Sequence, residues 1–125
     1  MIFDTDVLIW FMRGKPEAAQ AVASVHKESR FISVITYLEL VQGIRNKAEL
    51  KLLKEMLPQT GLAILPLSEN IGQLASDLMD KFKLSSGLEV QDALIAATAA
   101  SRHDTLYTGN LKHFKDLGLQ IKVFS

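Results

Sequence analysis

Short apolar stretches alternate along the chain with segments in which apolar residues recur every three or four positions. The stretches rich in β-favouring residues predict strands at residues 1–3, 30–34, 62–65 and 105–108, with an edge strand at 121–124. Strands that alternate with helices favour a parallel sheet covered on both faces, so the pattern predicts an α/β fold. Because no repeat, linker or low-complexity segment interrupts the pattern, we expect a single domain over residues 1–125.

The helical segments differ in how strongly they are marked. The clearest helix is predicted at residues 69–82, behind Ser68 as its N-cap. Pro16 is expected to open another helix, which fades near residues 26–29. A capping box at Thr36 to Glu39 predicts a third helix. Further helices are predicted from near Val7, at 48–57, where Pro58 ends the pattern, and at 90–102, which is apolar on every side and therefore central.

Composition excludes several classes of protein. Fourteen Lys and Arg residues balance fourteen Asp and Glu residues, so any polyanion would have to bind at a local patch. The absence of cysteine excludes disulfide frameworks, thiolate zinc sites and cysteine nucleophiles. The longest apolar run, residues 7–12, is far too short to span a bilayer, and Asp4 and Asp6 lie where a signal peptide would be basic. We therefore expect a soluble, cytoplasmic protein.

Acidic residues at element ends are the main candidates for chemistry. Asp4 follows the first strand, at the edge where parallel sheets bind ligands, although turn formation or capping also explains an Asp there. Asp6 is the better N-cap of the two. Asp92 lies at the head of the most apolar helix, where burial of its carboxylate requires compensation. Glu39 either completes its own capping box or joins a site.

A shared cation would explain these acids if they converge. Carboxylates brought together repel one another unless they are protonated or bind a divalent ion. No lysine or arginine lies within four residues before Asp4, Glu39 or Asp92. Oxygen ligands without cysteine or a close histidine pair favour Mg²⁺ or Mn²⁺ over zinc. Such an ion can activate water for attack on a phosphodiester.

Four blocks in order along the chain resemble the PIN-domain family, specifically the VapC-type toxins of toxin-antitoxin pairs. The blocks are Asp4-Thr5-Asp6-Val7-Leu8-Ile9, Ile35-Thr36-Tyr37-Leu38-Glu39-Leu40-Val41-Gln42-Gly43, Asp92-Ala93-Leu94-Ile95-Ala96-Ala97-Thr98-Ala99 and Leu106-Tyr107-Thr108-Gly109-Asn110. Each block alone is weak, but their order over nearly the full chain makes the resemblance specific.

The resemblance implies a Mg²⁺- or Mn²⁺-dependent endoribonuclease with a PIN-like three-layer α/β/α sandwich around a mainly parallel sheet. It also implies that Asp4, Glu39 and Asp92 form the metal site. Where the family commonly has a fourth acid, this chain has His113, with Asn110 and Asp116 as substitutes. This departure puts a second metal ion in question. The implied partners are RNA and a VapB-type antitoxin, in a homodimer or a toxin-antitoxin hetero-oligomer.

Other residues are assigned supporting roles. Thr5 and Thr108, beside strand ends, are expected to orient carboxylates or a phosphate, with simple turn chemistry as the alternative. The densest basic group, Arg45, Lys47 and Lys51 together with Lys54, is the first choice for RNA contact. Arg13 and Lys15 are the second choice. A solvated helix surface explains the basic group equally well.

The consecutive apolar residues at 7–12 point in every direction around a helix, so one core cannot cover them all. We therefore expect part of this run, Trp10 or Phe11, to contact another chain, either an antitoxin or a second copy. Burial between the sheet and neighbouring helices is the alternative.

Two other functions compete with the nuclease. The motif Asp4-Thr5-Asp6-Val7 also fits a haloacid-dehalogenase-type phosphohydrolase in which Asp4 is phosphorylated, but the chain has no Gly-Asp or Asp-Asp dipeptide for the late acidic pair of that family. A PIN-like binding module without catalytic activity would explain the missing fourth acid.

Overall fold

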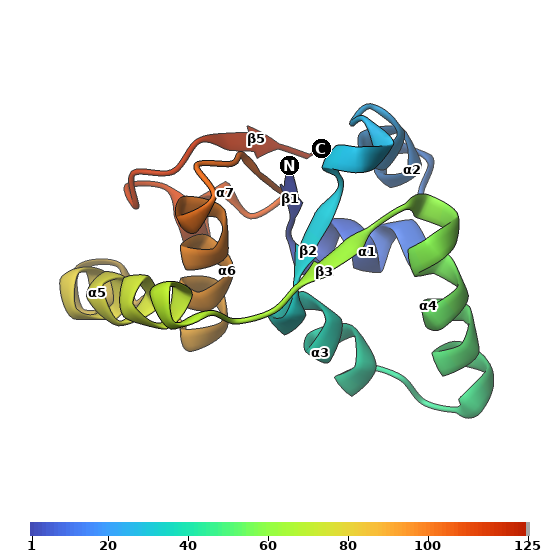
Figure 1. Cartoon of the computed structure of the whole chain (residues 1–125), viewed down its shortest axis with the longest axis horizontal. Coiled ribbons are helices and arrows are strands. Elements are labelled where there is room, and N and C mark those ends of the chain that lie inside the picture. The colour runs from blue at the N-terminus through green and yellow to red at the C-terminus, as the bar shows by residue number, and fades with distance from the viewer. Residues whose placement is uncertain (125) are drawn as a thin grey trace.

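A five-stranded sheet forms the centre of the molecule, and every neighbouring pair of strands is parallel. The computed structural model describes residues 1–124. The strand order is β3-β2-β1-β4-β5, and β3 and β5 form the edges (Figure 1). The strands are β1 (Ile2–Phe3), β2 (Phe31–Ser33), β3 (Ala63–Leu65), β4 (Leu106–Thr108) and β5 (Ile121–Val123). The predicted parallel α/β sheet is therefore confirmed, including its late edge strand.

Helices cover both faces of the sheet, which gives the predicted three-layer sandwich. The helices are α1 (Thr5–Met12), α2 (Pro16–Ala23), α3 (Val34–Gln42), α4 (Lys47–Thr60), α5 (Glu69–Ser86), α6 (Val90–Ser101) and α7 (Leu111–Phe114). One core joins Phe3 to α1, α2 and α4, and the other joins Ile2 to α5, α6 and α7. Figure 1 shows these two groups on opposite sides of the strands.

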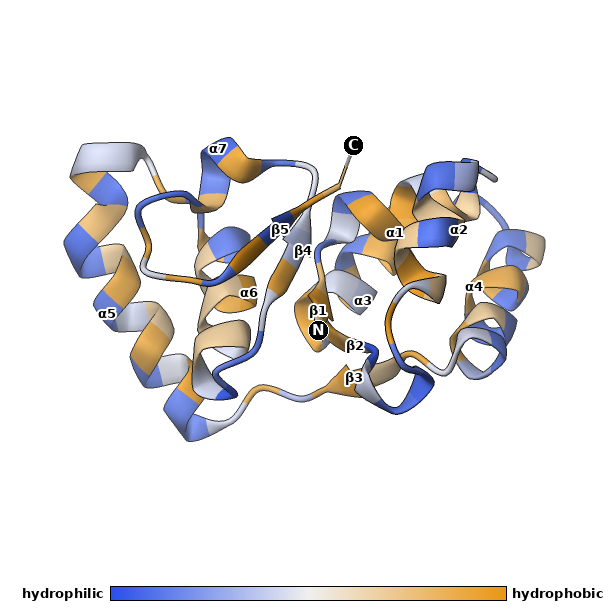
Figure 2. Ribbon diagram, turned by 90° about the horizontal axis from the view of Figure 1, so that it is seen from above, coloured by the Kyte–Doolittle hydropathy of each residue, from blue (hydrophilic) through white to orange (hydrophobic). Residues whose placement is uncertain are grey.

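The hydropathy of each element matches its depth in the fold. Both residues of β1 are completely buried, because successive side chains of a central strand point to opposite covered faces. Helix α6 buries most of its alanines against the sheet, as its uniform apolar pattern predicts. In contrast, α4 and α5 alternate between hydrophilic and hydrophobic residues, as expected of surface helices (Figure 2).

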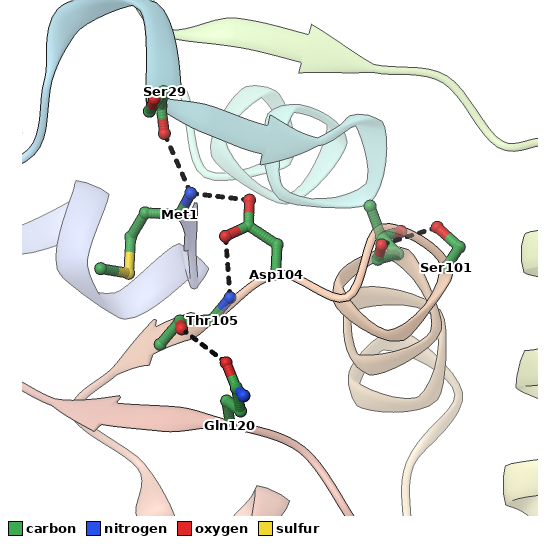
Figure 3. Close-up of polar contacts among 7 residues, drawn as sticks. Met1, Ser29, Ser101, Asp104, Thr105 and Gln120 are labelled. Carbon is green, nitrogen blue, oxygen red and sulfur yellow. Dashed lines mark hydrogen bonds and ion pairs between the residues drawn. The ribbon is translucent and has the colours of Figure 1, made fainter.

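The two ends of the parallel strands have different contacts. At the amino ends, the Met1 amino group donates to Asp104 Oδ2 at 2.7 Å and to the Ser29 carbonyl oxygen at 3.0 Å (Figure 3). There Thr105 Oγ1 also donates to Gln120 Oε1 at 3.3 Å. At the carboxyl ends, β1 leads into Asp4 and β4 ends in Thr108. Parallel pairing therefore places these two polar residues side by side at the carboxyl ends of the strands, which we call the carboxyl edge of the sheet.

Two predicted helix starts are wrong because the caps lie nearer to the strands. Asp4, not Asp6, caps α1, which begins at Thr5 rather than near Val7. Ser33 caps α3 by accepting from the Ile35 N–H at 3.0 Å, so Thr36 lies inside the helix. Asp4 directly follows β1 and Ser33 is the last residue of β2, so the backbone turns into each helix without an intervening loop.

Three predicted helix ends are also wrong, and the first is that of α5, which runs to Ser86 rather than to residue 82. Helix α2 ends at Ala23, and residues 27–29 form a separate 3₁₀ turn. Helix α4 continues through Pro58 to Thr60, where Gly61 adopts a left-handed conformation with φ of 73°. Pro58 lies in the last turn, so its missing N–H removes one hydrogen bond from a helix that is about to end.

No helix within residues 1–124 has the length and hydropathy that a membrane span requires.

Candidate active site

Asp4 is a buried carboxylate fixed at the junction of β1 and α1. Only 5% of its surface is exposed. Its Oδ1 accepts from the Thr5 N–H at 2.8 Å, and its Oδ2 accepts from Thr108 Oγ1 at 2.8 Å. Burial, and next the charge of Asp6, raise the pKa of Asp4 from 3.8 to about 7, although the two hydrogen bonds oppose the rise. Asp4 therefore carries its negative charge at a cost that a cation would relieve.

Asp6 binds the turn that follows β4. The backbone N–H of Gly109 donates to Asp6 Oδ2 at 2.9 Å, whereas Asp6 Oδ1 is buried and has no hydrogen-bond partner among residues 1–124. Burial raises the pKa of Asp6, and the Gly109 N–H opposes this shift. The second carboxylate of the Asp4-Thr5-Asp6 motif therefore also lies at the site, and one of its oxygens is available.

Glu39 reaches the same edge from α3. Its Oε1 accepts a hydrogen bond from Thr5 Oγ1 at 2.6 Å, and the Thr5 hydroxyl lies 3.1 Å from that of Thr36. Thr36 is completely buried. The capping-box interpretation of Glu39 is therefore wrong, because the carboxylate bonds to α1 and not to the start of its own helix. Thr36 was not predicted as a site residue from the sequence. The signal that could have revealed it is a hydroxyl among the apolar residues of a helix.

Asp92 lies in the first turn of α6 and is half-buried. Its Oδ2 lies 3.3 Å from His113 Nδ1 on α7. Burial raises the pKa of Asp92, the charge of His113 opposes that rise, and the negative charge of Glu39 adds to it. Asp92 therefore interacts electrostatically with Glu39 and Asp6, and His113 contacts the acid site from the position where a fourth acid was expected.

The structure thus brings acidic residues from α1, α3 and α6 to one edge of the sheet. Asp92 raises the pKa of Asp4, and Glu39 and Asp6 raise that of Asp92, so these charges interact through space. No lysine or arginine within residues 1–124 forms an ion pair with Asp4, Glu39 or Asp92. Local ion pairs therefore do not account for the cluster.

The donor set suits a hard divalent cation in its chemistry. Among residues 1–124 it offers several carboxylates and a buried Asp6 oxygen without a hydrogen-bond partner, and the chain contains no thiolate. Within the described residues, however, no three acidic or histidine side chains already stand in an arrangement that could hold a metal ion. The chemistry of these oxygens therefore suits a hard cation, whereas their spacing in residues 1–124 does not by itself define a metal site.

Asn110 and Asp116, the other two candidates to replace the family's fourth acid, lie in different places. The Asn110 N–H donates to Thr108 Oγ1 at 2.9 Å, which connects Asn110 through its backbone to the hydroxyl that holds Asp4. Asp116 lines a separate cavity with Ala100, near the end of α6. Because Ala100 lies eight residues after Asp92, roughly 12 Å along the helix axis, the fold does not bring Asp116 to the acids.

The basic residues predicted to contact RNA are largely paired. Arg45 binds Glu49 at 2.8 Å, and Lys51 Nζ lies 4.0 Å from Glu55, while Lys47 is exposed. Arg45 and Glu49 border an open groove of about 630 Å³ that also reaches Glu39. Its apolar lining comes from α1, α3, α4 and the loop between α3 and α4, and includes Ile9, Met12, Leu40, Ile44 and Leu52. The RNA-binding role of Arg45, Lys47 and Lys51 stays a prediction.

The consecutive apolar residues at the start of the chain divide between core and surface. Val7 and Leu8 are completely buried, and Phe11 packs partly against the core. Trp10 is 40% exposed. The core therefore does not cover the whole run, as the pattern indicates.

Gly109 provides a test of how tightly this edge is packed. A Cβ at Gly109 would lie 2.6 Å from Asp6 Oδ2, so Gly109→Ala must displace the carboxylate and break its bond to the Gly109 N–H. We expect the variant to lower the free energy of unfolding in urea by about 1 kcal/mol. Gly72→Ala is the matched control, because Gly72 lies within α5 and, apart from its neighbours and its own helix backbone, no atom of residues 1–124 comes within 4 Å of the point that a Cβ would occupy. Alanine there should stabilise by about 0.5–1 kcal/mol. Equal stabilisation by both variants would contradict the close packing.

Comparison with known proteins agrees with this geometry. The sequence profile of the PIN domain family matches residues 1–118. "Ribonuclease VapC1" of Rickettsia felis is 32% identical over 132 residues, which cover 100% of this chain and 96% of that protein. "Ribonuclease VapC19" of Mycobacterium tuberculosis is 29% identical over 116 residues and 90% of each chain. Among solved structures, VapBC-1 from nontypeable Haemophilus influenzae has a TM-score of 0.82 at 26% identity, covering 99% of this chain and 98% of that one.

The fold and the site thus define the class of protein: an α/β sandwich that carries acidic residues at the carboxyl ends of its parallel strands. Within that class, the chain belongs to the PIN domain family. The resemblance seen in the sequence is confirmed, and the relatives do not favour the haloacid-dehalogenase alternative.

Proposed function

We propose that this protein is a metal-dependent endoribonuclease and the toxin component of a toxin-antitoxin pair. The observation that carries the proposal is the cluster of Asp4, Glu39 and Asp92, acids far apart in sequence whose charges act on one another without a lysine or arginine partner in residues 1–124. The relatives named as VapC ribonucleases support the reaction class. Their names also weigh against the alternative of an inactive binding module.

Asp4, Glu39 and Asp92 are the residues that would hold Mg²⁺, with Mn²⁺ as a substitute. A bound ion would supply activation of water and stabilisation of the charge that develops on the phosphodiester. Asp6 Oδ1 is a further oxygen donor at the same edge.

The surrounding residues hold the carboxylates in place. Thr108 and the Thr5 N–H each bind one oxygen of Asp4, which leaves that carboxylate little rotational freedom. The Thr5 hydroxyl fixes Glu39 Oε1, so Oε2 is the oxygen free to bind an ion or accept a proton from water. Glu39 therefore serves as a ligand or as the general base, and the geometry suits both roles.

The proposed partner is a VapB-type antitoxin in a hetero-oligomer, with toxin homodimers as a further assembly. Structurally similar chains come from VapBC complexes. The groove between α1, α3 and α4 exposes Ile9, Met12 and Leu52, which is an unfavourable surface for an isolated protein. An apolar antitoxin segment in that groove would cover these side chains and approach Glu39. A toxin that cleaves cellular RNA would act in the cytoplasm.

The proposal is tested by end-mapped cleavage of total cellular RNA by purified protein freed of antitoxin. We expect discrete cuts with Mg²⁺, none in EDTA, and a rate at least about 100-fold lower for Asp92→Asn. Asp80→Asn is the control, because it makes the same chemical change on the exposed surface of α5. Binding of Mn²⁺, followed by electron paramagnetic resonance, should weaken in Asp92→Asn and not in the control.

Equal cleavage in EDTA, or by Asp92→Asn, would indicate a contaminating nuclease or a different mechanism. Protein that binds no Mn²⁺ and cleaves no RNA would instead support the inactive binding module.

A further inference from the structure

An exposed aromatic ring with two cations beside it lies at the end of α1. Trp10 is 40% exposed and is the only tryptophan in the chain. The Lys15 Nζ lies 4.7 Å from the centre of its ring, and the Arg13 Cζ lies 5.3 Å from it. Trp10, Arg13, Lys15 and Phe124 are together called the Trp10 strip.

The two cations of the Trp10 strip have no acidic side chain as a partner within residues 1–124. This distinguishes them from Arg45 and Lys51, whose charges are paired with Glu49 and Glu55. Cation–π contact stabilises an exposed cation only modestly, and it leaves the positive charges available to an anion. The strip therefore combines a flat aromatic surface with positive charge.

The Trp10 strip continues to the acid site. Lys15 Nζ lies 5.5 Å from the centre of the Phe124 ring, which is buried and therefore supports Lys15 rather than contacting a ligand itself. Phe124 Cδ1 in turn lies 3.4 Å from the point that a Cβ on Gly109 would occupy, and the Gly109 N–H binds Asp6. Along α1, Trp10 comes six residues after Asp4, roughly 9 Å at the helical rise. One extended single strand of RNA is therefore long enough to contact both the Trp10 strip and the acids.

We propose that the Trp10 strip binds the single-stranded RNA beside the scissile phosphate, with a base stacked on Trp10 and backbone phosphates at Arg13 and Lys15. The inference rests on the proposed function and adds the residues that position its substrate. Stacking on an aromatic ring accepts any base, and cations at the ring edge recruit the backbone. The positive charge favours a polyanion here, whereas the adjoining groove, which Arg13 also lines, is mainly apolar and favours a protein segment.

Because Trp10 is the single tryptophan, its fluorescence reports directly on binding at the Trp10 strip. The protein, in EDTA to prevent cleavage, is titrated with a short single-stranded 2′-O-methyl oligoribonucleotide while Trp10 emission is recorded. We expect saturable quenching whose midpoint shifts to higher oligonucleotide concentration as salt is added. Arg13→Gln and Lys15→Gln should each weaken binding about three- to tenfold. Lys83→Gln, an exposed lysine at the end of α5, is the matched control and should leave binding unchanged.

Fluorescence polarisation of a labelled oligonucleotide extends the test to Trp10 itself. Trp10→Ala is expected to weaken binding about tenfold, and Trp10→Phe, which keeps an aromatic surface, should retain most of it. Quenching and weakened variants without any RNA cleavage would uphold the strip and refute the nuclease. The opposite result is RNA cleavage without quenching of Trp10, together with wild-type binding by Arg13→Gln and Lys15→Gln. It would overturn the proposed RNA-binding role of the Trp10 strip and leave the proposed nuclease activity intact. Quenching by an antitoxin but not by the oligonucleotide would overturn it as well, because the strip would then be a protein interface.

Discussion

Replacing Asp4 with asparagine is expected to lower the rate of RNA cleavage by about 100-fold or more while the protein remains folded. Loss of residues that merely support a metal ligand typically costs 10- to 100-fold, so loss of a ligand should cost at least as much. Asparagine keeps the shape of the side chain. Its carbonyl oxygen can accept from the Thr5 N–H, and its amide can donate to Thr108 Oγ1, whose proton can turn away.

The measurement is single-turnover cleavage of a mapped RNA substrate, with the fold checked by circular dichroism. Asp80→Asn should cleave at the wild-type rate, because this exposed side chain lies on α5. Wild-type cleavage by Asp4→Asn would mean that Asp4 serves only as the N-cap of α1.

The sequence was sufficient for the sheet because buried parallel strands and amphipathic helices have distinct periods. It also located Asp4 correctly, since a residue directly after a strand must lie at the carboxyl edge. The same argument applies to Thr108, which is the last residue of β4. Positions at strand ends are thus predictable once the strands are.

Hydrogen-bond partners were much harder to predict, as α3 illustrates. Thr36 and Glu39 have the spacing of a capping box, yet Ser33 is the cap and Glu39 bonds to Thr5. Both Ser33 and Thr36 can cap a helix, and which of them does so depends on the residue at which β2 ends. The Thr5–Glu39 contact joins residues 34 positions apart, so no local pattern encodes it.

The contacts of Asp6 and Asp92 were hidden for the same reason. Gly109 approaches Asp6 across 103 positions, and His113 reaches Asp92 from a helix of four residues that the periodicity did not reveal. Four residues make barely one turn, which is too short for an amphipathic pattern to be recognised. Acids could therefore be nominated from the sequence, but their partners required the fold.

The metal-free protein is expected to lose stability as the pH rises from about 4 to about 8, because Asp4 prefers to be protonated in the folded state. Its folded pKa of about 7 lies above the ordinary value of 3.8. The contribution of Asp4 is therefore fully present below pH 3.8 and is lost as the pH rises through about 7. At about 1.4 kcal/mol per pKa unit, the shift corresponds to a loss on the order of 4 kcal/mol. The pKa values of Asp6 and Asp92 are also raised by burial, which adds to the trend.

The contribution of Asp4 is isolated by comparing wild type with Asp4→Asn in urea unfolding at about pH 5 and pH 8, both in EDTA. Asparagine cannot ionise, so the variant should gain stability relative to wild type at the higher pH and show a flatter pH dependence. Mn²⁺ added at pH 8 should raise the stability of wild type more than that of the variant, because an ion that binds only the folded state stabilises it by mass action. If the two proteins instead respond equally to pH, then Asp4 is not held as an ionised carboxylate at an energetic cost, and the argument that its charge calls for a cation fails.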